Sequence, residues 1–243
     1  DEFGNKIRSK TVEYPMYQPK NGWAEQDPQD WYNAVYETLK YVSEGVDNIC
    51  GIGLSGQMHG LVALDKDDNV IRPAILWNDG RTQANSDYLN EKIGKSVLSE
   101  HTANISFAGF TAPKILWLEE NENENFAKIA KIMLPKDYLV YRLSGVHATD
   151  YSDASGMLLL DVKNRKWSAE MAKICHVKSE WLPRLYESYE AVGTIKSEIA
   201  SELGLNEDVL ICAGAGDNAA AAVGTGVVGE GGCNISLGTS GTV

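Results

Sequence analysis

Basic residues are scarce in this sequence, and the shortage limits which partners the chain can have. There are 22 lysines and arginines against 34 aspartates and glutamates, a formal net charge of -12 at pH 7. A nucleic-acid backbone or an anionic membrane surface attracts proteins with the opposite balance of charge. We therefore expect no nucleic acid and no membrane as the main partner, although a local basic patch could still hold a phosphate group.

Long apolar runs and targeting signals are missing as well. The sequence has no stretch of 18 apolar residues, so no membrane-spanning helix is expected. Its first ten residues, DEFGNKIRSK, are charged and do not resemble a signal peptide. The chain starts without a methionine and in what looks like a turn, which predicts that it is a piece of a longer protein.

Cysteines are few and form no redox or metal motif. None of Cys50, Cys175, Cys212 and Cys233 belongs to a C-x-x-C pair. Cys50, Cys212 and Cys233 lie within or beside apolar runs, which favours buried free thiols in a reducing compartment and hence a cytoplasmic location. Cys175 and His176 could form half of a metal site, but no second pair lies near them in sequence, so no metal site is expected.

Local patterns along the chain predict an α/β fold without repeats. The clearest helix start is Asp27 followed by Pro28, a capping residue and a first-turn residue. Helices are expected at 28–42, 82–94, in part of 112–133, and at 136–143, 169–175, 197–203 and 218–223. Strand patterns occur at 10–18, within 47–60, in a hairpin of 61–65 and 70–79, at 156–161, within 208–217, and on both sides of a turn within 231–243.

Three junctions between a strand and a loop carry polar or aromatic side chains, and such ends converge at one edge of an α/β sheet. In SGQMHG, Met58 offers an apolar surface and His59 offers two ring nitrogens. In LWNDGR, Trp77 could stack on the carbon face of a sugar. The alternatives are a hairpin turn with a surface histidine, and a plain turn at Asp79 and Gly80.

The third junction, GAGDN, delivers a single carboxylate to a helix start. Gly214 and Gly216 let the chain bend sharply where a side chain would clash. Asp217 could then cap the helix, which is the commoner role for an isolated motif of this kind, or serve as a general base. The two roles are compatible, because hydrogen bonds to the charged form keep a carboxylate ionised.

A glycine- and threonine-rich turn near the end of the sequence suits phosphate oxygens. In SLGTSGT, Gly238 and Thr239 expose backbone N–H groups and a hydroxyl to one concavity. The pattern is not the G-x-x-x-x-G-K-[ST] loop, so a Walker-type site is excluded.

Together these motifs resemble the FGGY carbohydrate kinases and, within them, the xylulose kinases. The resemblance covers residues 20–243 and rests on ordered blocks: GWAEQDPQDWY, GLSGQMHG, RPAILWNDGRT, GFTAPKILWL, LPKDYLVYRLSG, TDYSDASGMLLLD, GAGDNAAAAVGTG and SLGTSG. It implies an actin-like, ribonuclease-H-like fold of two domains with a cleft between them. Residues 1–227 would then be the sugar-binding domain without its first strand, and 228–243 the start of the nucleotide-binding domain.

The resemblance also implies roles for particular residues. Asp217 matches the general base. Sugar contacts match Met58, His59, Trp77 and Asn218, with Phe110 near the pocket, and the nucleotide-phosphate hairpin matches Gly238 and Thr239. The implied reaction is transfer of a phosphoryl group from ATP to D-xylulose, with Mg²⁺ held mainly by residues outside this chain.

Other interpretations stay open beside this one. The substrate could be gluconate, ribulose, glycerol or a related polyol, or the chain could be a sugar-binding module without catalysis. A homodimer is compatible with the sequence. The family's opening strand, its Asp-Leu-Gly-Thr-type turn and most of the second domain are absent from these 243 residues. We therefore expect the chain on its own to be inactive.

Overall fold

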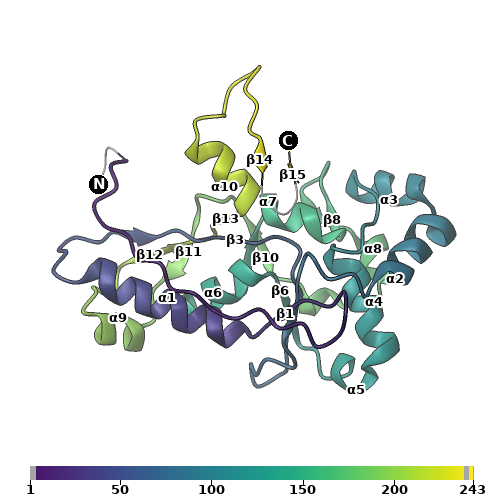
Figure 1. The fold of residues 1–243 in the computed structure, drawn as a ribbon, viewed down its shortest axis with the longest axis horizontal. Coiled ribbons are helices and arrows are strands. Elements are labelled where there is room, and N and C mark those ends of the chain that lie inside the picture. The colour runs from purple at the N-terminus through teal and green to yellow at the C-terminus, as the bar shows by residue number, and fades with distance from the viewer. Residues whose placement is uncertain (1–3, 238–240, 243) are drawn as a thin grey trace.

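The computed structural model, which describes residues 4–237 and 241–242, has the mixed α/β architecture that the sequence predicts (Figure 1). One end of the molecule holds α1 (Pro28–Ser43), α6 (Pro135–Ser144) and α9 (Ser197–Leu203) around short strands. The other end is mainly helical and holds α2 to α5 and α8. Two large hydrophobic clusters correspond to these two ends, and a third lies under α1.

Helix α1 begins where the sequence predicts. The Asp27 carboxylate accepts a hydrogen bond from the Gln29 amide at 2.9 Å, and Pro28 occupies the first turn, where its missing N–H costs nothing. Trp31 is buried, whereas Val35 and Leu39 are half-buried and pack on the hydrophobic cluster beneath α9. The predicted apolar face is therefore the face that packs.

Two parallel strand pairs bring distant parts of the sequence side by side. Strand β2 (Gly51–Ile52) pairs with β12 (Leu210–Cys212), which also pairs in antiparallel fashion with β11 (Ala191–Thr194). Further along the same two segments, β3 (Ser55–Gly56) pairs with β13 (Ala215–Gly216). Both segments run in the same direction, so the turns that follow β3 and β13 lie at the same edge.

The predicted hairpin forms beside these pairs. Isolated bridges join Leu61 to Ile75 and Leu64 to Val70. The remaining pairs around it are antiparallel: β4 (Val62–Leu64) with β6 (Lys131–Met133), and β5 (Ala74–Ile75) with β1 (Glu25–Gln26). Trp77 lies two residues after the end of β5.

The remaining elements are short. The helices are α2 (Gln83–Tyr88), the π-helix η1 (Leu89–Gly94), α3 (Lys95–Thr102), α4 (Thr111–Asn121), α5 (Asn123–Phe126), α7 (Tyr151–Ala154), the 3₁₀-helices η2 (Ser155–Met157) and η3 (Ser179–Trp181), α8 (Ala169–Ile174) and α10 (Asp217–Gly224). The strands are β7 (Ala148–Asp150) with β10 (Arg184–Tyr186), β8 (Leu160–Asp161) with β9 (Lys166–Trp167), and β14 (Ser236–Leu237) with β15 (Gly241–Thr242). Among the described residues, none of the helices has the length and apolar character needed to cross a bilayer.

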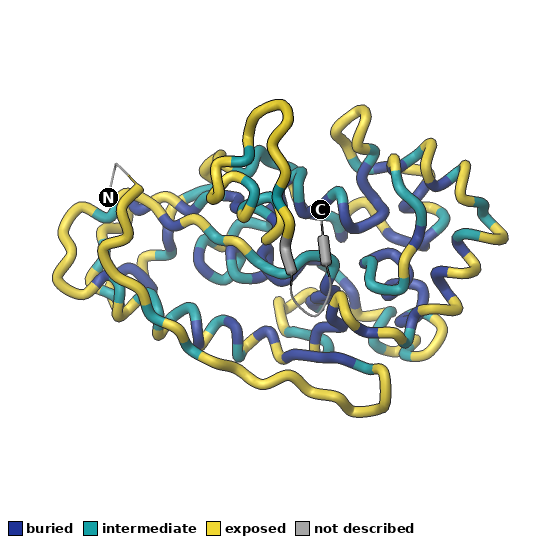
Figure 2. The backbone as a smooth tube through the Cα atoms, turned by 45° about the horizontal axis from the view of Figure 1, so that its top comes forward, coloured by how far each residue is buried: buried dark blue, intermediate teal, exposed yellow. Residues whose placement is uncertain are grey.

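Helix α10 projects from the body of the molecule. It lies above β13 and α7 in Figure 1, and none of its residues is buried. The segment that follows it toward β14 is mostly exposed as well, which Figure 2 shows as a long yellow loop. Asp217, the first residue of α10, therefore lies where the projection joins the body.

Two strand predictions are wrong. Residues 10–18 form no strand, and only an isolated bridge joins Tyr17 to Glu25, because the alternating side chains are nearly all exposed and have no apolar surface to cover. Within 156–161 only Leu160 and Asp161 are extended. Leu158 has φ +63°, and its apolar neighbours are buried in a 3₁₀ turn. A buried apolar run does not by itself specify a strand.

The prediction of buried cysteines is largely wrong as well. All four thiols are free, but Cys175 is the one that is buried, while Cys50 and Cys233 are exposed and Cys212 is half-buried. Cys50 and Cys233 lie in loops, and Cys212 ends β12, where side chains alternate between faces, so an apolar neighbour in sequence did not indicate burial.

Candidate functional site

The turn after β3 holds His59 in an unusual backbone conformation. His59 has φ +67°, and the Gly60 amide donates to the Met58 carbonyl at 2.9 Å, which closes a three-residue γ-turn. Positive φ is uncommon outside glycine and costs energy. The carbonyl of His59 is fixed by Thr111 Oγ1 at 3.1 Å and by Lys114 Nζ at 2.9 Å. A strained backbone that is held in place by several surrounding contacts is typical of functional sites.

The imidazole of His59 is neutral and has a defined orientation. Its Nδ1 lies 2.8 Å from the carbonyl of Gly156, and since a carbonyl only accepts, Nδ1 carries the hydrogen. The ring stacks on Phe110, with centroids 4.6 Å apart. Burial lowers the pKa of His59 to about 4, which the Gly156 bond opposes and Lys114 supports. Nε2 is therefore an acceptor near neutral pH and can receive a hydrogen bond from a hydroxyl.

A buried lysine that the sequence reasoning missed ties three turns together. Besides the His59 carbonyl, Lys114 Nζ donates to the carbonyl of Gly109. Gly109 lies against the backbone of Trp77, so close that a Cβ would be 2.4 Å from the Trp77 oxygen. Burial lowers the pKa of Lys114 to about 7, against the pull of Asp79. The signal in the sequence was one lysine inside the apolar stretch TAPKILWL.

Trp77 is positioned by a turn in which Asp79 has a structural role. The carboxylate of Asp79 is buried, accepts from the Ala24 amide at 2.6 Å, and pairs with Arg81 at 2.7 Å. The interpretation of Asp79 and Gly80 as a turn agrees with these contacts. Trp77 itself remains 37% exposed. The backbone of Trp77 lies beside Gly109, the residue before Phe110, and its side chain is partly open to solvent.

The turn after β13 brings Asp217 next to Met58. A Cβ on Gly216 would lie 3.0 Å from Met58 Cγ, and Asn218 Nδ2 lies 3.9 Å from Met58 Sδ. The residues on both sides of Asp217 thus touch the residue that precedes His59. Asp217 is exposed. The structure therefore brings together Met58, His59, Asp217 and Asn218, which the sequence proposed as one site.

Asp217 is not the capping residue of its helix. Gly216 occupies the N-cap position without a side-chain cap, and Asp217 is the first helical residue. Its Oδ1 accepts a hydrogen bond from the amide of Asn218 at 2.8 Å. This bond fixes the direction of the carboxylate at the start of the helix. The geometry leaves the carboxylate at the surface, where it can meet a ligand.

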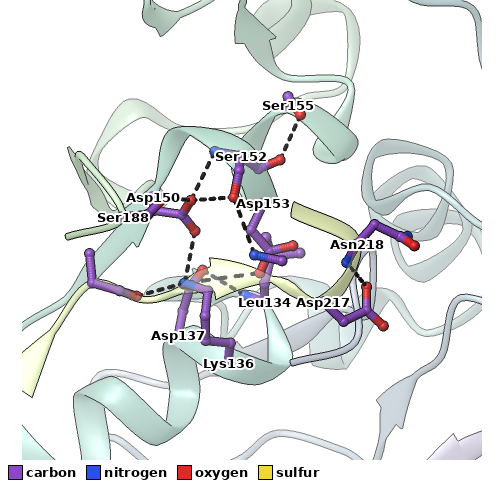
Figure 3. A network of polar contacts seen from close by, with 12 residues as sticks. Leu134, Lys136, Asp137, Asp150, Ser152, Asp153, Ser155, Ser188, Asp217 and Asn218 are labelled. Atoms are coloured by element: carbon purple, nitrogen blue, oxygen red, sulfur yellow. Dashed lines mark hydrogen bonds and ion pairs between the residues drawn. The ribbon is translucent and has the colours of Figure 1, made fainter. Parts of the chain in front are cut away.

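Behind this turn lies a fully buried cluster of charges, shown in Figure 3, that the sequence reasoning also missed. Lys136 Nζ lies 2.7 Å from Asp137, 3.1 Å from Asp150 and 4.0 Å from Asp153, and it donates to the carbonyl of Ala213 at 2.9 Å. Burial alone would lower the pKa of Lys136, but the three aspartates raise it above its ordinary value. The ammonium is therefore permanently charged.

Asp153 has the least favourable surroundings for a charged carboxylate in this cluster. Among the described residues, neither side-chain oxygen of Asp153 receives a hydrogen bond. Burial raises the pKa of Asp153 well above its ordinary value, with Asp137, Asp150 and Asp217 adding to the effect against the attraction of Lys136. Burial raises the pKa of Asp137 as well, against the attraction of Lys136, so the shared ammonium offsets only part of the cost of burying these acids.

Part of the expected nucleotide site lies outside the described residues. Gly238 and Thr239 fall between β14 and β15, in the stretch 238–240, so their proposed contact with phosphate stays a prediction. Within 4–237 and 241–242, no group of three or more His, Cys, Asp or Glu side chains is arranged to hold a metal ion.

In this α/β fold, two parallel strand ends bring a strained histidine close to an exposed aspartate. The sequence resemblance implies the same arrangement. A family model described as the N-terminal domain of the FGGY family of carbohydrate kinases matches residues 1–224. The chain belongs to the FGGY family of carbohydrate kinases.

Particular relatives agree with this assignment. A xylulose kinase from Lactococcus lactis subsp. lactis is 44% identical over 100% of the chain and 49% of its own length. A solved xylulose kinase from Brucella ovis superimposes with a TM-score of 0.94 at 41% identity, covering 99% of this chain and 50% of that one. A gluconate kinase structure from Lactobacillus acidophilus gives a TM-score of 0.81 at 30% identity, covering 85% and 42%. The chain spans about half the length of the curated relatives it matches.

Proposed function

We propose that this chain is the sugar-binding part of an ATP-dependent xylulose kinase that converts D-xylulose to D-xylulose 5-phosphate. Residues 1–227 would form the sugar-binding domain and 228–243 the start of the nucleotide-binding domain. Support comes from the family assignment and from a relative named xylulose kinase that is 44% identical along the whole chain.

The observation that carries the proposal is the position of Asp217. An exposed carboxylate begins α10, and the residues before and after it contact Met58. A sugar hydroxyl is a poor nucleophile while it keeps its proton. In the proposed step that proton passes to Asp217 as the hydroxyl oxygen bonds to the γ-phosphorus and the bond to the leaving ADP breaks. General-base catalysis of this kind contributes about 10²–10⁴ in rate.

The neighbouring side chains are proposed to orient the sugar. His59 presents Nε2 as an acceptor for a hydroxyl, because its Nδ1 is committed to Gly156. Trp77 offers apolar ring surface to a carbon face, and the amide of Asn218 offers a polar contact beside the base. Fixed groups of this kind align the reacting hydroxyl with the base.

The nucleotide is proposed to bind on the side of Asp217 that faces away from the sugar. ATP with Mg²⁺ supplies the phosphoryl group and neutralises its developing charge. Gly238 and Thr239 would hold its phosphates, and the Mg²⁺ ligands would lie mainly outside this chain.

The direct test replaces the base by its uncharged isostere. In a complete kinase that contains this chain, Asp217→Asn should lower turnover at least about a hundredfold while sugar affinity, measured by calorimetry, stays within about twofold. Asp208→Asn is the matched control, because Asp208 is an exposed aspartate in the loop before β12. Near-normal turnover of Asp217→Asn would reduce Asp217 to a structural residue.

A second substrate class has a specific observation in its favour. The gluconate kinase structure from Lactobacillus acidophilus is 30% identical to this chain, so a sugar acid is the nearest alternative. A panel of xylulose, ribulose, gluconate and glycerol, compared by kcat/KM, separates the candidates. Sugar binding without turnover on any of them would indicate a binding module instead of a kinase.

A further inference from the structure

The backbone of the turn before Asp217 is held almost entirely by other backbone segments. Three of the four amides between 213 and 216 donate to carbonyls of distant residues, at 2.9, 3.0 and 3.1 Å. The fourth amide, that of Gly216, donates to a side chain, the hydroxyl of Ser152, at 3.2 Å. Gly216 is buried and directly precedes Asp217. Ser152 therefore fixes the Ala215–Gly216 peptide group, one residue before the proposed base.

The direction of the Ser152 hydroxyl is set by Asp150. The hydroxyl donates to Asp150 Oδ2, because a carboxylate beside the Lys136 ammonium can only accept. With its hydrogen committed, Ser152 Oγ presents its lone pairs to the Gly216 amide. The negative charge of Asp150 thus polarises the Ser152 hydroxyl, whose oxygen accepts the hydrogen bond from Gly216 in a defined direction.

Asp150 is itself held rigidly inside the protein. It is fully buried, pairs with Lys136 at 3.1 Å, and accepts further bonds from Ser188 Oγ at 2.7 Å and from the Ser152 amide at 2.9 Å. Figure 3 shows this chain of contacts leading from Lys136 through Asp150 and Ser152 toward the Asp217 turn. A path of polar contacts therefore joins a buried charge cluster to the backbone amide of Gly216, the residue before Asp217.

We propose that Ser152 is a positioning residue for phosphoryl transfer, which holds Asp217 in its working place through the amide of Gly216. The inference rests on the proposed function of Asp217 and adds a residue that acts through the backbone. A displacement of about 1 Å at a reacting group is enough to cost about 10² in rate. Loss of the hydroxyl should therefore affect turnover far more than sugar affinity.

The test compares two serines of the same segment in a complete kinase that contains this chain. Ser152→Ala should lower kcat at least about tenfold and leave the sugar dissociation constant within about twofold. Ser155→Ala is the matched control, because the Ser155 hydroxyl only donates to the carbonyl of Ser152, at 2.7 Å, and it should keep kcat within about twofold. Ser152→Thr, which retains a hydroxyl, should recover most of the lost turnover.

A double-mutant cycle separates positioning of the base from a general structural effect. In the Asp217→Asn background, Ser152→Ala should change the residual kcat less than about twofold, because the base that it positions is gone. A full loss in that background would overturn the proposal. Hydrogen exchange of the Gly216 amide should also be faster in Ser152→Ala than in Ser155→Ala.

The outcomes distinguish this inference from the proposed function. Asp217→Asn could lose turnover while Ser152→Ala and Ser155→Ala have equal kcat. This result overturns the role of Ser152 and leaves the role of Asp217 standing. Normal turnover in Asp217→Asn overturns both. Should Ser152→Ala fail to fold, Ser152→Cys keeps the volume but donates and accepts weakly, and the same comparisons apply to it.

Discussion

At the scale of single residues, the site depends on side chains whose ordinary behaviour is changed by burial. Burial keeps the ring of His59 neutral, while the bond from its Nδ1 to Gly156 fixes the orientation of the ring. Lys114 and Lys136 are buried lysines that donate to backbone carbonyls on either side of the site. Each of the three fixes a turn that local sequence alone leaves free.

His59 should make the stability of the protein depend on pH. Its pKa in the folded state, about 4, is below the ordinary 6.5, so the unfolded chain binds the extra proton first. The stability that neutral His59 contributes is complete above about pH 6.5 and is lost as pH falls toward 4, by up to about 3 kcal/mol. Thermal unfolding at pH 7 and pH 5 measures the loss.

The control for this measurement is His59→Asn, which does not titrate and whose side chain tolerates positive φ. The loss of stability between pH 7 and pH 5 should be smaller in this variant than in the unaltered protein. Burial also lowers the pKa of His147, but His147 is present in both proteins and its effect cancels. Equal losses would show that His59 titrates normally.

Sequence reasoning identified the residues at the surface of the site and missed those beneath it. Met58, His59, Asp217 and Asn218 follow glycine-flanked strand ends, and such local signals are visible in a sequence. The burial of Lys114 and Lys136 was not visible, because long charged side chains are buried only where tertiary contacts supply partners.

At the scale of elements, the decisive feature is the parallel pairing of β3 with β13. Each of these strands has two residues, and the register places Gly56 beside Gly216. Gly214, with φ +76°, supplies the bend before β13 and lies against the Leu54 carbonyl. The close approach of the two segments is possible because a side chain is missing at that position.

Gly214→Ala should therefore destabilise the protein and misplace α10. A Cβ at this position would lie 2.1 Å from the Leu54 oxygen and 3.0 Å from Lys136 Cδ. Gly226→Ala is the control, since Gly226 has φ +78° but no atom within 4 Å of the place that a Cβ would take. Both variants bear backbone strain, but urea unfolding should show an additional loss of about 1–3 kcal/mol in Gly214→Ala. Equal losses would mean that the contact with Leu54 is relieved at little cost.

Elements with a local stop or start signal were predicted well. Helices α1, α6, α8 and α9 begin or end at the capping residues and glycines that the sequence indicates. The strand pattern at 10–18 was misleading because a strand needs a partner along its length, and among the described residues it has only the isolated bridge from Tyr17 to Glu25. Strand pairing depends on distant residues, which short patterns do not encode.

At the scale of the whole molecule, the chain supplies one side of the proposed reaction. It covers 49% of the length of the xylulose kinase from Lactococcus lactis. The groups proposed to bind sugar and to remove its proton lie on described residues. The turn proposed to bind phosphate lies at 238–240, near the end of the sequence.

Purified residues 1–243 should therefore bind sugar only weakly and transfer no phosphoryl group. The proposed adenine pocket and most phosphate ligands belong to the second domain, so the γ-phosphate would not be aligned with the sugar. A coupled assay for ADP with xylulose as acceptor measures this, with a complete kinase as the positive control. ADP formation faster than the rate measured without sugar would contradict the proposal that the second domain is needed for phosphoryl transfer.

Helix α10 is anchored at one end, since none of its eight residues is buried and its first turn contacts β13 and β3. Asp217 lies at the N-terminus of this helix, and the C-terminus lies roughly 12 Å away. The position of the Asp217 carboxylate therefore depends on a helix that meets the body of the molecule at one end.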